Sequence, residues 1–371
     1  MGWMNLLLEL LELIFQMISL DDVMNCRATC RSWRKAADAI FSSQLPLMLS
    51  LSFGYPNDLG SLSAPWSNYD STVLTEKWPQ EIDNYYNSIY SVQGWLVFNI
   101  FHYESVKGQT LFSELSFFNP FSRARFKLPK LFLYSGGRCY YQLRLAFNSA
   151  PPGSEEFVVA FLADELFYDI EVHDNNKLYG LTFKHGTSVV FVFTLGDNHR
   201  DDHIVERLVM LNTIEGIAFS ELRVSDEFFK RRHQMVMDTR TGELLLVCHE
   251  GNRRFDSLVL HSSLRTKGFS VFKLDRSNLK WCEVFDIGDR FLFWNFAQVS
   301  FVSAKGLRVE ERFKRGNCIF FCHANIYGIY QFSELKKYDI GVFFLADRTI
   351  SHFLVSCLPN THWNMWFSPA P

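Results

Sequence analysis

Cysteine and histidine side chains that lie close together are the groups in this sequence whose spacing could bind a metal ion. Cys318, Cys322 and His323 form one such group. The two thiols would share one face of an extended strand, but a structural zinc site needs four ligands, and no second ligand pair accompanies them. Cys26 and Cys30 lie one helical turn apart, which is typical of small apolar residues packed in a helix. We therefore expect buried thiols, no metal site and no bound cofactor.

Carboxylate and histidine side chains are densest at Asp201, Asp202 and His203, where they could act as acids or bases. They follow the polar segment 196–200, which is typical of a solvated loop. The basic run 230–233 either addresses a nuclear import receptor or lies at an exposed strand edge. The chain has no Gly-x-Ser-x-Gly, Walker, Gly-x-Gly-x-x-Gly or His-Glu-x-x-His motif. The sequence therefore predicts no catalytic residues, and we expect a protein that is not an enzyme.

The composition and charge of the chain narrow the classes of partner further. A hydrophobic fraction of 48% with 16% aromatic residues predicts a folded protein with a large core. The formal net charge of −3 lacks the strongly basic character that nucleic-acid binding usually requires. Glu9, Glu12 and Gln16 interrupt the apolar N-terminal run, unlike a signal peptide or membrane span. With eight scattered cysteines, we expect a cytoplasmic or nuclear protein that binds neither nucleic acid nor membranes.

The first forty residues have the periodicity of helices. When the segment 4–18 is drawn as a helix, Glu9, Glu12 and Gln16 project into one narrow sector, and the rest of the circumference is apolar. A domain this small covers one apolar side only, so the other side must meet a second domain or another protein. The apolar residues at the three- and four-residue spacing of one helical face are Leu6, Leu7, Leu10, Leu11, Ile14 and Ile18.

Two further helices are predicted after this segment. Ser19 and Asp22 have the spacing of a capping box, which indicates the end of the first helix and the start of a second helix that runs to Cys30. In the next segment an aromatic residue and three aliphatic residues share one helical face, which predicts a third helix. These residues are Trp33, Ala36, Ala37 and Ile40.

Three runs in these helices carry a family resemblance: 3–11 (WMNLLLELL), 19–23 (SLDDV) and 30–34 (CRSWR). They resemble the F-box of plant F-box proteins, although F-boxes usually have a proline where Leu7 stands. The resemblance implies that the first helix and the turn after it bind a Skp1-like protein and, through it, a cullin. A three-helix cap on a β domain is the alternative. The implied Skp1 contacts are Leu6, Leu7, Leu10, Ile14, Leu20 and Val23, and the implied F-box core residues are Trp33 and Cys30.

From about residue 45 onward the sequence has the pattern of a large β domain. Four hairpins share an apolar strand, a turn residue and a second apolar strand, with Asn119, Asp238, Asp275 and Asp347 at the turns. Multiples of about 40 residues separate these turns, which predicts a kelch-like β-propeller of about six or seven blades. A double β-sandwich is the structural alternative. The clearest strand candidates are 94–99, 156–162, 188–195, 235–237, 244–247, 269–274, 318–321 and 342–345.

Short motifs through the β domain carry a second resemblance. They include 94–96 (GWL), 118–122 (FNPFS), 268–274 (GFSVFKL), 281–284 (WCEV) and 366–369 (WFSP). Over most of residues 90–369 the chain resembles the plant domain of unknown function 295, the KIB-type β-propeller. We therefore expect an F-box at residues 1–44 and a β-propeller-like substrate-recognition domain at residues 45–371.

The two resemblances together imply the substrate-recognition adaptor of an SCF-type (Skp1–cullin–F-box) E3 ubiquitin ligase. Such an adaptor holds a target protein, unknown here, while a separate enzyme transfers ubiquitin to it. The alternative function is a non-ligase β-propeller scaffold with a degenerate F-box. A propeller hydrolase would need acids or histidines that converge on a central channel, and the sequence has no repeated acidic ring.

Overall fold

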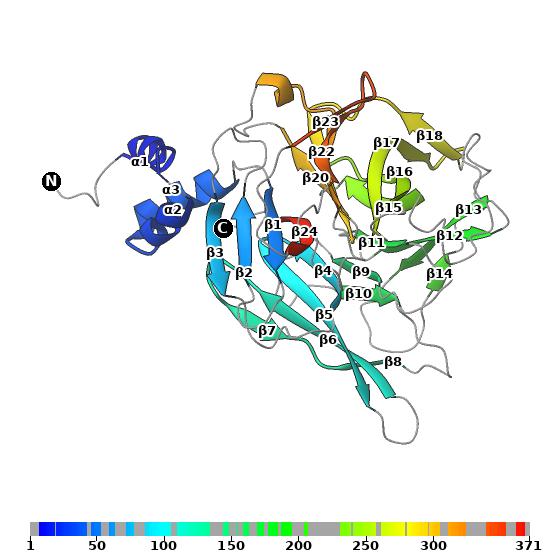
Figure 1. The fold of residues 1–371 in the computed structure, drawn as a ribbon, viewed down its shortest axis with the longest axis horizontal. Coiled ribbons are helices and arrows are strands. Elements are labelled where there is room, and N and C mark those ends of the chain that lie inside the picture. Colours follow the sequence, from blue (N-terminus) through cyan, green and yellow to red (C-terminus); the bar gives the residue numbers. More distant parts are fainter. Residues whose placement is uncertain are drawn as a thin grey trace.

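The computed structural model is mainly β, with three short helices at one side of the strands (Figure 1). The residues that it describes are 7–18, 20–42, 46–52, 59–63, 72–77, 86–104, 110–133, 144–147, 154, 159–162, 169–173, 177–184, 187–194, 204–206, 231–238, 240–256, 261–278, 280–295, 297–304, 311–323, 339–353 and 361–367.

The three helices are α1 (Leu8–Phe15), α2 (Leu20–Arg27) and α3 (Arg31–Ser42), in agreement with the expected number and order. α1 is shorter than the apolar segment 4–18, because the backbone at Leu7 is extended, with φ −58° and ψ 141°. None of the described helices has the length and hydropathy needed to span a bilayer.

The described strands form six sheets, here named A to F, which agrees with the lower of the two expected blade numbers. Sheet C has two described strands, and the others have four or five. Sheet A contains β24 (Thr361–Phe367), β1 (Leu47–Ser52), β2 (Leu59–Ser63) and β3 (Thr72–Lys77); sheet B contains β4 (Tyr86–Val92), β5 (Trp95–Glu104), β6 (Thr110–Phe118), β7 (Arg125–Lys127) and β8 (Leu131–Leu133); sheet C contains β9 (Arg144–Phe147) and β10 (Val159–Leu162).

Sheets D and E are regular four-stranded meanders, whereas sheet F includes one parallel pair, β19 with β21. The short helix η3 (Glu311–Phe313) lies between β20 and β21 in the chain. Sheet D contains β11 (Asp169–His173), β12 (Lys177–Lys184), β13 (Thr187–Thr194) and β14 (Ile204–Glu206); sheet E contains β15 (Arg231–Asp238), β16 (Glu243–Asp256), β17 (His261–Asp275) and β18 (Lys280–Val284); sheet F contains β20 (Val299–Ser303), β19 (Arg290–Trp294), β21 (Cys318–His323), β22 (Asp339–Phe344) and β23 (Thr349–His352).

Each described sheet packs against the next, and sheet F packs against sheet A, so the six sheets form a ring. β24 contacts β4, β9 contacts β11, β11 contacts β15, β15 contacts β20, and β21 contacts β24. Aromatic side chains join sheets B and C, where the ring centroid of Phe147 lies 6.0 Å from that of Tyr90 and 6.4 Å from that of Phe117. This is the expected propeller arrangement, and a double sandwich would instead stack its sheets in separate pairs.

The first described strand of the β domain pairs with the last described strand, and this pairing closes the ring. β1 and β24 are antiparallel, with Leu47 opposite Phe367 and Ser50 opposite Asn364. Trp366 fixes β24 against sheet F, because its indole Nε1 donates a hydrogen bond of 3.0 Å to the backbone oxygen of Trp294. Because β24 pairs with β1 in one sheet, the two ends of the β domain are joined by backbone hydrogen bonds.

The four hairpin turns are confirmed, but the blade spacing derived from them is wrong. The Asp275 carboxylate accepts hydrogen bonds from Ser277 and Asn278, the Asp347 carboxylate accepts them from Thr349, and in both cases these bonds lower the pKa of the carboxyl. Asp238 and Asp275, however, both lie in sheet E, at the first and third of the three hairpin turns of its four-stranded meander. Their separation is therefore a distance within one blade.

Carboxylates join neighbouring sheets by accepting backbone N–H groups. In sheet D, Asp169 accepts a bond of 2.5 Å from the backbone N–H of Met235 in sheet E, and Glu171 accepts one of 3.4 Å from that of Met237. Burial and the neighbouring Asp169 raise the pKa of Glu171 well above its ordinary value. Folding therefore shifts the ionisation of Glu171 toward the neutral acid.

Replacement of Trp366 by alanine tests the ring closure. The side chain is 2% exposed and packs edge-on against Phe293, with ring centroids 5.4 Å apart. We expect Trp366→Ala to lower the free energy of unfolding by about 3–5 kcal/mol, the usual cost for a buried tryptophan, in urea unfolding experiments. Phe285→Ala, which removes a ring that is 56% exposed, serves as the control and should cost far less. Equal losses in the two variants would contradict this account of closure.

The raised pKa of Glu171 gives a second test, through the dependence of stability on pH. When folding raises the pKa of an acidic group, the free energy of unfolding of the protein falls as the pH rises from the unfolded-state pKa to the folded-state pKa. Glu171→Gln cannot ionise. It should therefore match wild type at about pH 3.5, below the ordinary carboxyl pKa of 4.5, and exceed its stability at pH 8. The amide oxygen of the variant can still accept the Met237 N–H. Urea unfolding at the two pH values measures this, and a variant that is less stable than wild type at pH 8 would show that the carboxylate form is the favoured one.

Candidate functional site

Helix α1 divides its surface into three sectors, and this division defines the candidate site. Leu11 and Phe15 are buried against α2 and α3, and Glu9 belongs to a polar sector. The third sector is apolar yet exposed in this chain. It consists of Leu10, Leu13 and Ile14 on α1, Leu7 just before it, and Met17 and Ile18 just after it, which together we call the outer face.

The outer face contains three of the six residues expected to contact Skp1. Leu7 is 68% exposed just before the helix, and Leu10 and Ile14 are 46% and 39% exposed on it. Leu6 lies outside the described residues. Leu20 is the first residue of α2, and its side chain is likewise outside the described part.

Val23 requires a correction, because it has no exposed surface. It lies in the small core of the three helices, with Leu11, Phe15 and Ile40. A side chain that is already covered by its own domain cannot supply apolar area to a partner, so Val23 belongs to the core and not to the proposed contacts. The position follows from α2, on which Val23 faces inward toward α1 and α3.

Three exposed apolar residues of the outer face were not among the expected contacts. Leu13 is 55% exposed, Met17 is 87% exposed and Ile18 is 36% exposed. The helical projection of the sequence already placed all three outside the polar sector of Glu9, Glu12 and Gln16. The signal that could have identified them was therefore present in the sequence.

The expected core residue Trp33 packs where the sequence placed it. Its ring lies 5.5 Å from that of Phe15 in an edge-on arrangement. Cys30 is half-buried just before α3, where its backbone oxygen accepts the N–H of Arg34. In the described core cluster, however, the cysteine that packs against the helices is Cys26.

An ion pair fixes α2 against α3 behind the outer face. The Nε of Arg27 lies 2.7 Å from the carboxylate of Asp38, and both side chains are about one-quarter to one-third exposed. An ion pair at this exposure contributes about 1 kcal/mol or less. The three helices therefore rely on their apolar core and on neighbouring elements to hold the outer face in place.

The cysteines of β21 are buried thiols, as expected. Cys318 and Cys322 are fully buried in an apolar cluster between sheets F and A, and burial raises the pKa of Cys318 to about 12. A thiol with this pKa is protonated at neutral pH and is a poor metal ligand. Within the described ranges, no group of three or more His, Cys, Asp or Glu side chains is arranged to hold a metal ion.

The remaining charged groups named from the sequence are only partly described. Asp201, Asp202 and His203 lie outside the described residues, as does Lys230. Residues 231–233 belong to β15, where His233 is half-buried.

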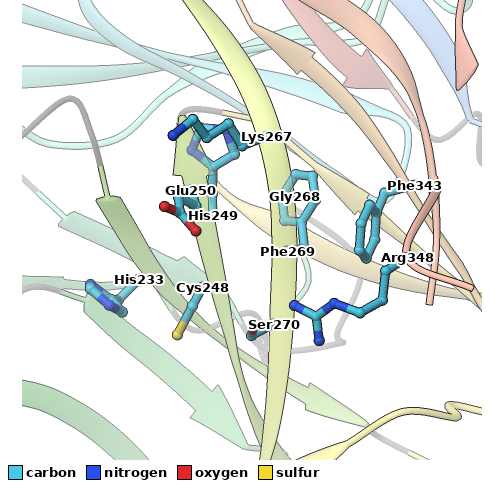
Figure 2. A pocket seen from close by; sticks show the side chains of 10 residues that line it. All are labelled: His233, Cys248, His249, Glu250, Lys267, Gly268, Phe269, Ser270, Phe343 and Arg348. Carbon is cyan, nitrogen blue, oxygen red and sulfur yellow. The ribbon is translucent and has the colours of Figure 1, made fainter. Parts of the chain in front are cut away.

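A recess of about 210 Å³ lies beside β15, β16 and β17 and the β22–β23 hairpin (Figure 2). Figure 2 shows Arg348 reaching from this hairpin toward β17, and Phe343 lies beside Gly268. The lining groups are mixed in charge, and Arg348 also lies 3.4 Å from the carboxylate of Glu283. The residues that line the recess are His233, Cys248, His249, Glu250, Lys267, Gly268, Phe269, Ser270, Phe343 and Arg348.

The recess contains a pair of side chains, Cys248 and His233, whose types could act in catalysis. Cys248 lies opposite His233 on the neighbouring strand, which is a pairing that a thiol nucleophile and its base could use. Cys248 is, however, 7% exposed and belongs to the apolar cluster between sheets D and E. This burial among apolar side chains favours packing as the role of this residue.

A turn of sheet F contacts sheet B. The side-chain amide of Gln298, between β19 and β20, donates a bond of 2.8 Å to the backbone oxygen of Ser91 and accepts one of 3.0 Å from its N–H. Ala297, from the same turn, packs against the cluster between sheets B and C. The turn therefore links sheet F to two sheets that do not follow or precede it in the ring.

Comparison with known proteins agrees with both parts of this description. A model of the F-box-like domain matches residues 8–43, which include all three helices. A model of the KIB1-4 β-propeller matches residues 67–344, about three quarters of the chain.

Other comparisons add little. A search of curated proteins found no match. Among solved structures, MPT-1, a GDP-Man-dependent mannosyltransferase from Leishmania mexicana, is 7% identical, with 86% of this chain and 90% of that chain covered. Its TM-score of 0.20 is too low to support any argument. The match to the propeller model therefore decides the assignment: the chain belongs to the KIB1-4 β-propeller family and carries an F-box-like domain at its N-terminal end.

Proposed function

We propose that this chain is the substrate-recognition adaptor of an SCF-type E3 ubiquitin ligase. In this proposal, the outer face of α1 binds a Skp1-like protein and, through it, a cullin, while the propeller holds a target protein. The observation that carries the proposal is the outer face itself, an apolar surface left exposed on a helix that matches the F-box-like domain. Exposed apolar surface of this kind marks a site for another protein.

The energetics of such docking are favourable. Burial of a leucine-sized side chain contributes about 1.5–3 kcal/mol, so the exposed residues of the outer face supply ample gross energy after the cost of association. Leu10, Leu13 and Ile14 project from one side of a regular helix and need little ordering before they bind. The Skp1 complex would therefore form on a largely preformed surface.

The proposed role of the chain in ubiquitination is proximity. The adaptor performs no chemistry, and it raises the local concentration of the target near the enzyme that transfers ubiquitin. Propellers recognise partners through the loops that join their strands, and the mixed polar recess beside β17 is one place where a target could bind. We further propose that the chain acts in the cytoplasm or nucleus, without binding nucleic acid or membranes.

The leucine in place of the usual F-box proline motivates the second candidate, a scaffold that does not bind Skp1. The backbone of Leu7 argues against this candidate. Its φ of −58° lies within the range that a proline ring fixes, and the backbone oxygen of Leu7 accepts the N–H groups of Leu10 and Leu11. Leucine therefore holds the start of α1 in the geometry that a proline would impose.

Replacement of Leu10 by aspartate tests the outer face directly. Leu10 lies in the first turn of α1, where a negative charge is favourable to the helix, so the variant should remain folded. The lost apolar contact and the cost of burying a carboxylate should together weaken Skp1 binding by about a hundredfold or more. The measurement is a titration of the purified full chain with a Skp1-like protein.

Gln16→Asp is the control for charge, because it adds the same charge in the polar sector at the C-terminal end of α1. A negative charge is less favourable to the helix there than at Leu10, so circular dichroism should first establish that both variants keep the wild-type helix content. Gln16→Asp should bind Skp1 about as tightly as wild type. If Leu10→Asp retained wild-type affinity, the outer face would not be the binding surface. If folded wild type showed no binding, the scaffold candidate would replace the ligase adaptor.

Replacement of Leu7 by proline tests the backbone argument. Because the native φ suits proline, we expect Leu7→Pro to stabilise the start of α1 by about 0.4–1 kcal/mol through lower entropy of the unfolded chain. Hydrogen exchange of the α1 amides should slow accordingly. Faster exchange in this variant would contradict the argument, because it would mean that the backbone at Leu7 is not compatible with proline.

A further inference from the structure

We infer that Phe121 couples the closure of the propeller ring to the order of the F-box helices. Phe121 lies in the turn between β6 and β7 of sheet B and is half-buried. It packs against the core of the three helices and also against the strand that closes the ring. Its consequence for Skp1 binding rests on the proposed function, whereas the coupling itself does not.

The turn that presents Phe121 is fixed by its own hydrogen bonds. The side-chain oxygen of Asn119 accepts the backbone N–H groups of Phe121 at 3.0 Å and Ser122 at 2.8 Å. Arg123 has φ +59° and donates its N–H to the backbone oxygen of Asn119 at 2.8 Å. Asn119 is buried, so the acceptor end of this network is shielded from water, whereas Ser122 and Arg123 are exposed. Phe121 is therefore held in place by the propeller rather than by the helices that it touches.

On one side Phe121 contacts the closing strand. Its ring lies 5.8 Å from the ring of Phe367, the last residue of β24. Phe367 has no exposed surface and pairs with Leu47, the first residue of β1. The Phe121 contact can thus form as described only when β24 has joined sheet A.

On the other side Phe121 completes the helical core. That core is small, with Ala36 and Ala37 among its buried residues, and a unit of three short helices buries too little apolar surface to be stable alone. The outer face of α1 is directed to a partner and gives no support within the chain. The propeller must therefore supply the missing support. It does so through the contact of Phe121 with the helical core and through the contact of α2 with β3.

The consequence is a fixed order of events. A chain in which β24 has not closed the ring lacks the support behind the helices and presents the outer face poorly. Phe121 is a positioning residue in this account, because it acts through the F-box helices and does not itself meet Skp1.

Hydrogen exchange of the free full chain tests the coupling without any partner. Phe121→Ala should speed exchange of the amides of α2 and α3 by about tenfold or more, while the amides of sheets D and E keep their wild-type rates. Phe121→Leu retains apolar volume and should restore most of the protection. Ser122→Ala, which changes the exposed neighbour in the same turn, is the matched control and should leave the helices unchanged.

A second comparison addresses the closing strand. Phe367→Ala should also speed exchange in the helices, and the effects of Phe121→Ala and Phe367→Ala should be less than additive, because both remove the same contact. Unchanged helix exchange in folded Phe121→Ala, or fully additive effects, would overturn the coupling. If the coupling held but wild type failed to bind Skp1, the proposed function alone would fail.

Discussion

The pairing of β24 with β1 is the constraint on which the rest of the structure depends. It joins the two ends of the β domain in one sheet, and the ring of six described sheets is continuous because of it. Met48 and Trp366 from these two strands enter the cluster that unites sheets A and F. The same pairing brings Phe367 to the turn of sheet B that touches the helices, so the closure reaches the F-box-like domain as well.

The second feature that determines the arrangement of the helices is how the apolar surface of α1 is divided between a buried side and an exposed side. Leu11 and Phe15 are used to hold three short helices together, and the residues of the outer face remain unused within the chain. A helix that is apolar on two sides, with one side left exposed, is typical of a surface that another protein covers. In the proposed function, one side of this eight-residue helix holds the three helices together and the other side binds the partner.

Much of this arrangement could be predicted from the sequence, and the exceptions have clear physical reasons. Local patterns determine the helices and the turns at Asn119, Asp238, Asp275 and Asp347, since both depend on residues close in the chain. Val23 was misplaced because a periodic pattern shows which side is apolar but not whether the domain itself covers it. The role of Phe121 depends on contacts with residues far away in the sequence, and no local pattern reports these.

The measurement that tests the central claim most directly is hydrogen exchange of the full chain with and without a Skp1-like protein. We expect new protection in α1 and the turn after it, with the propeller strands unchanged, because the outer face is the surface that we propose the partner covers. Protection on the propeller strands with none in α1 would contradict the account, since the partner would then bind a different surface.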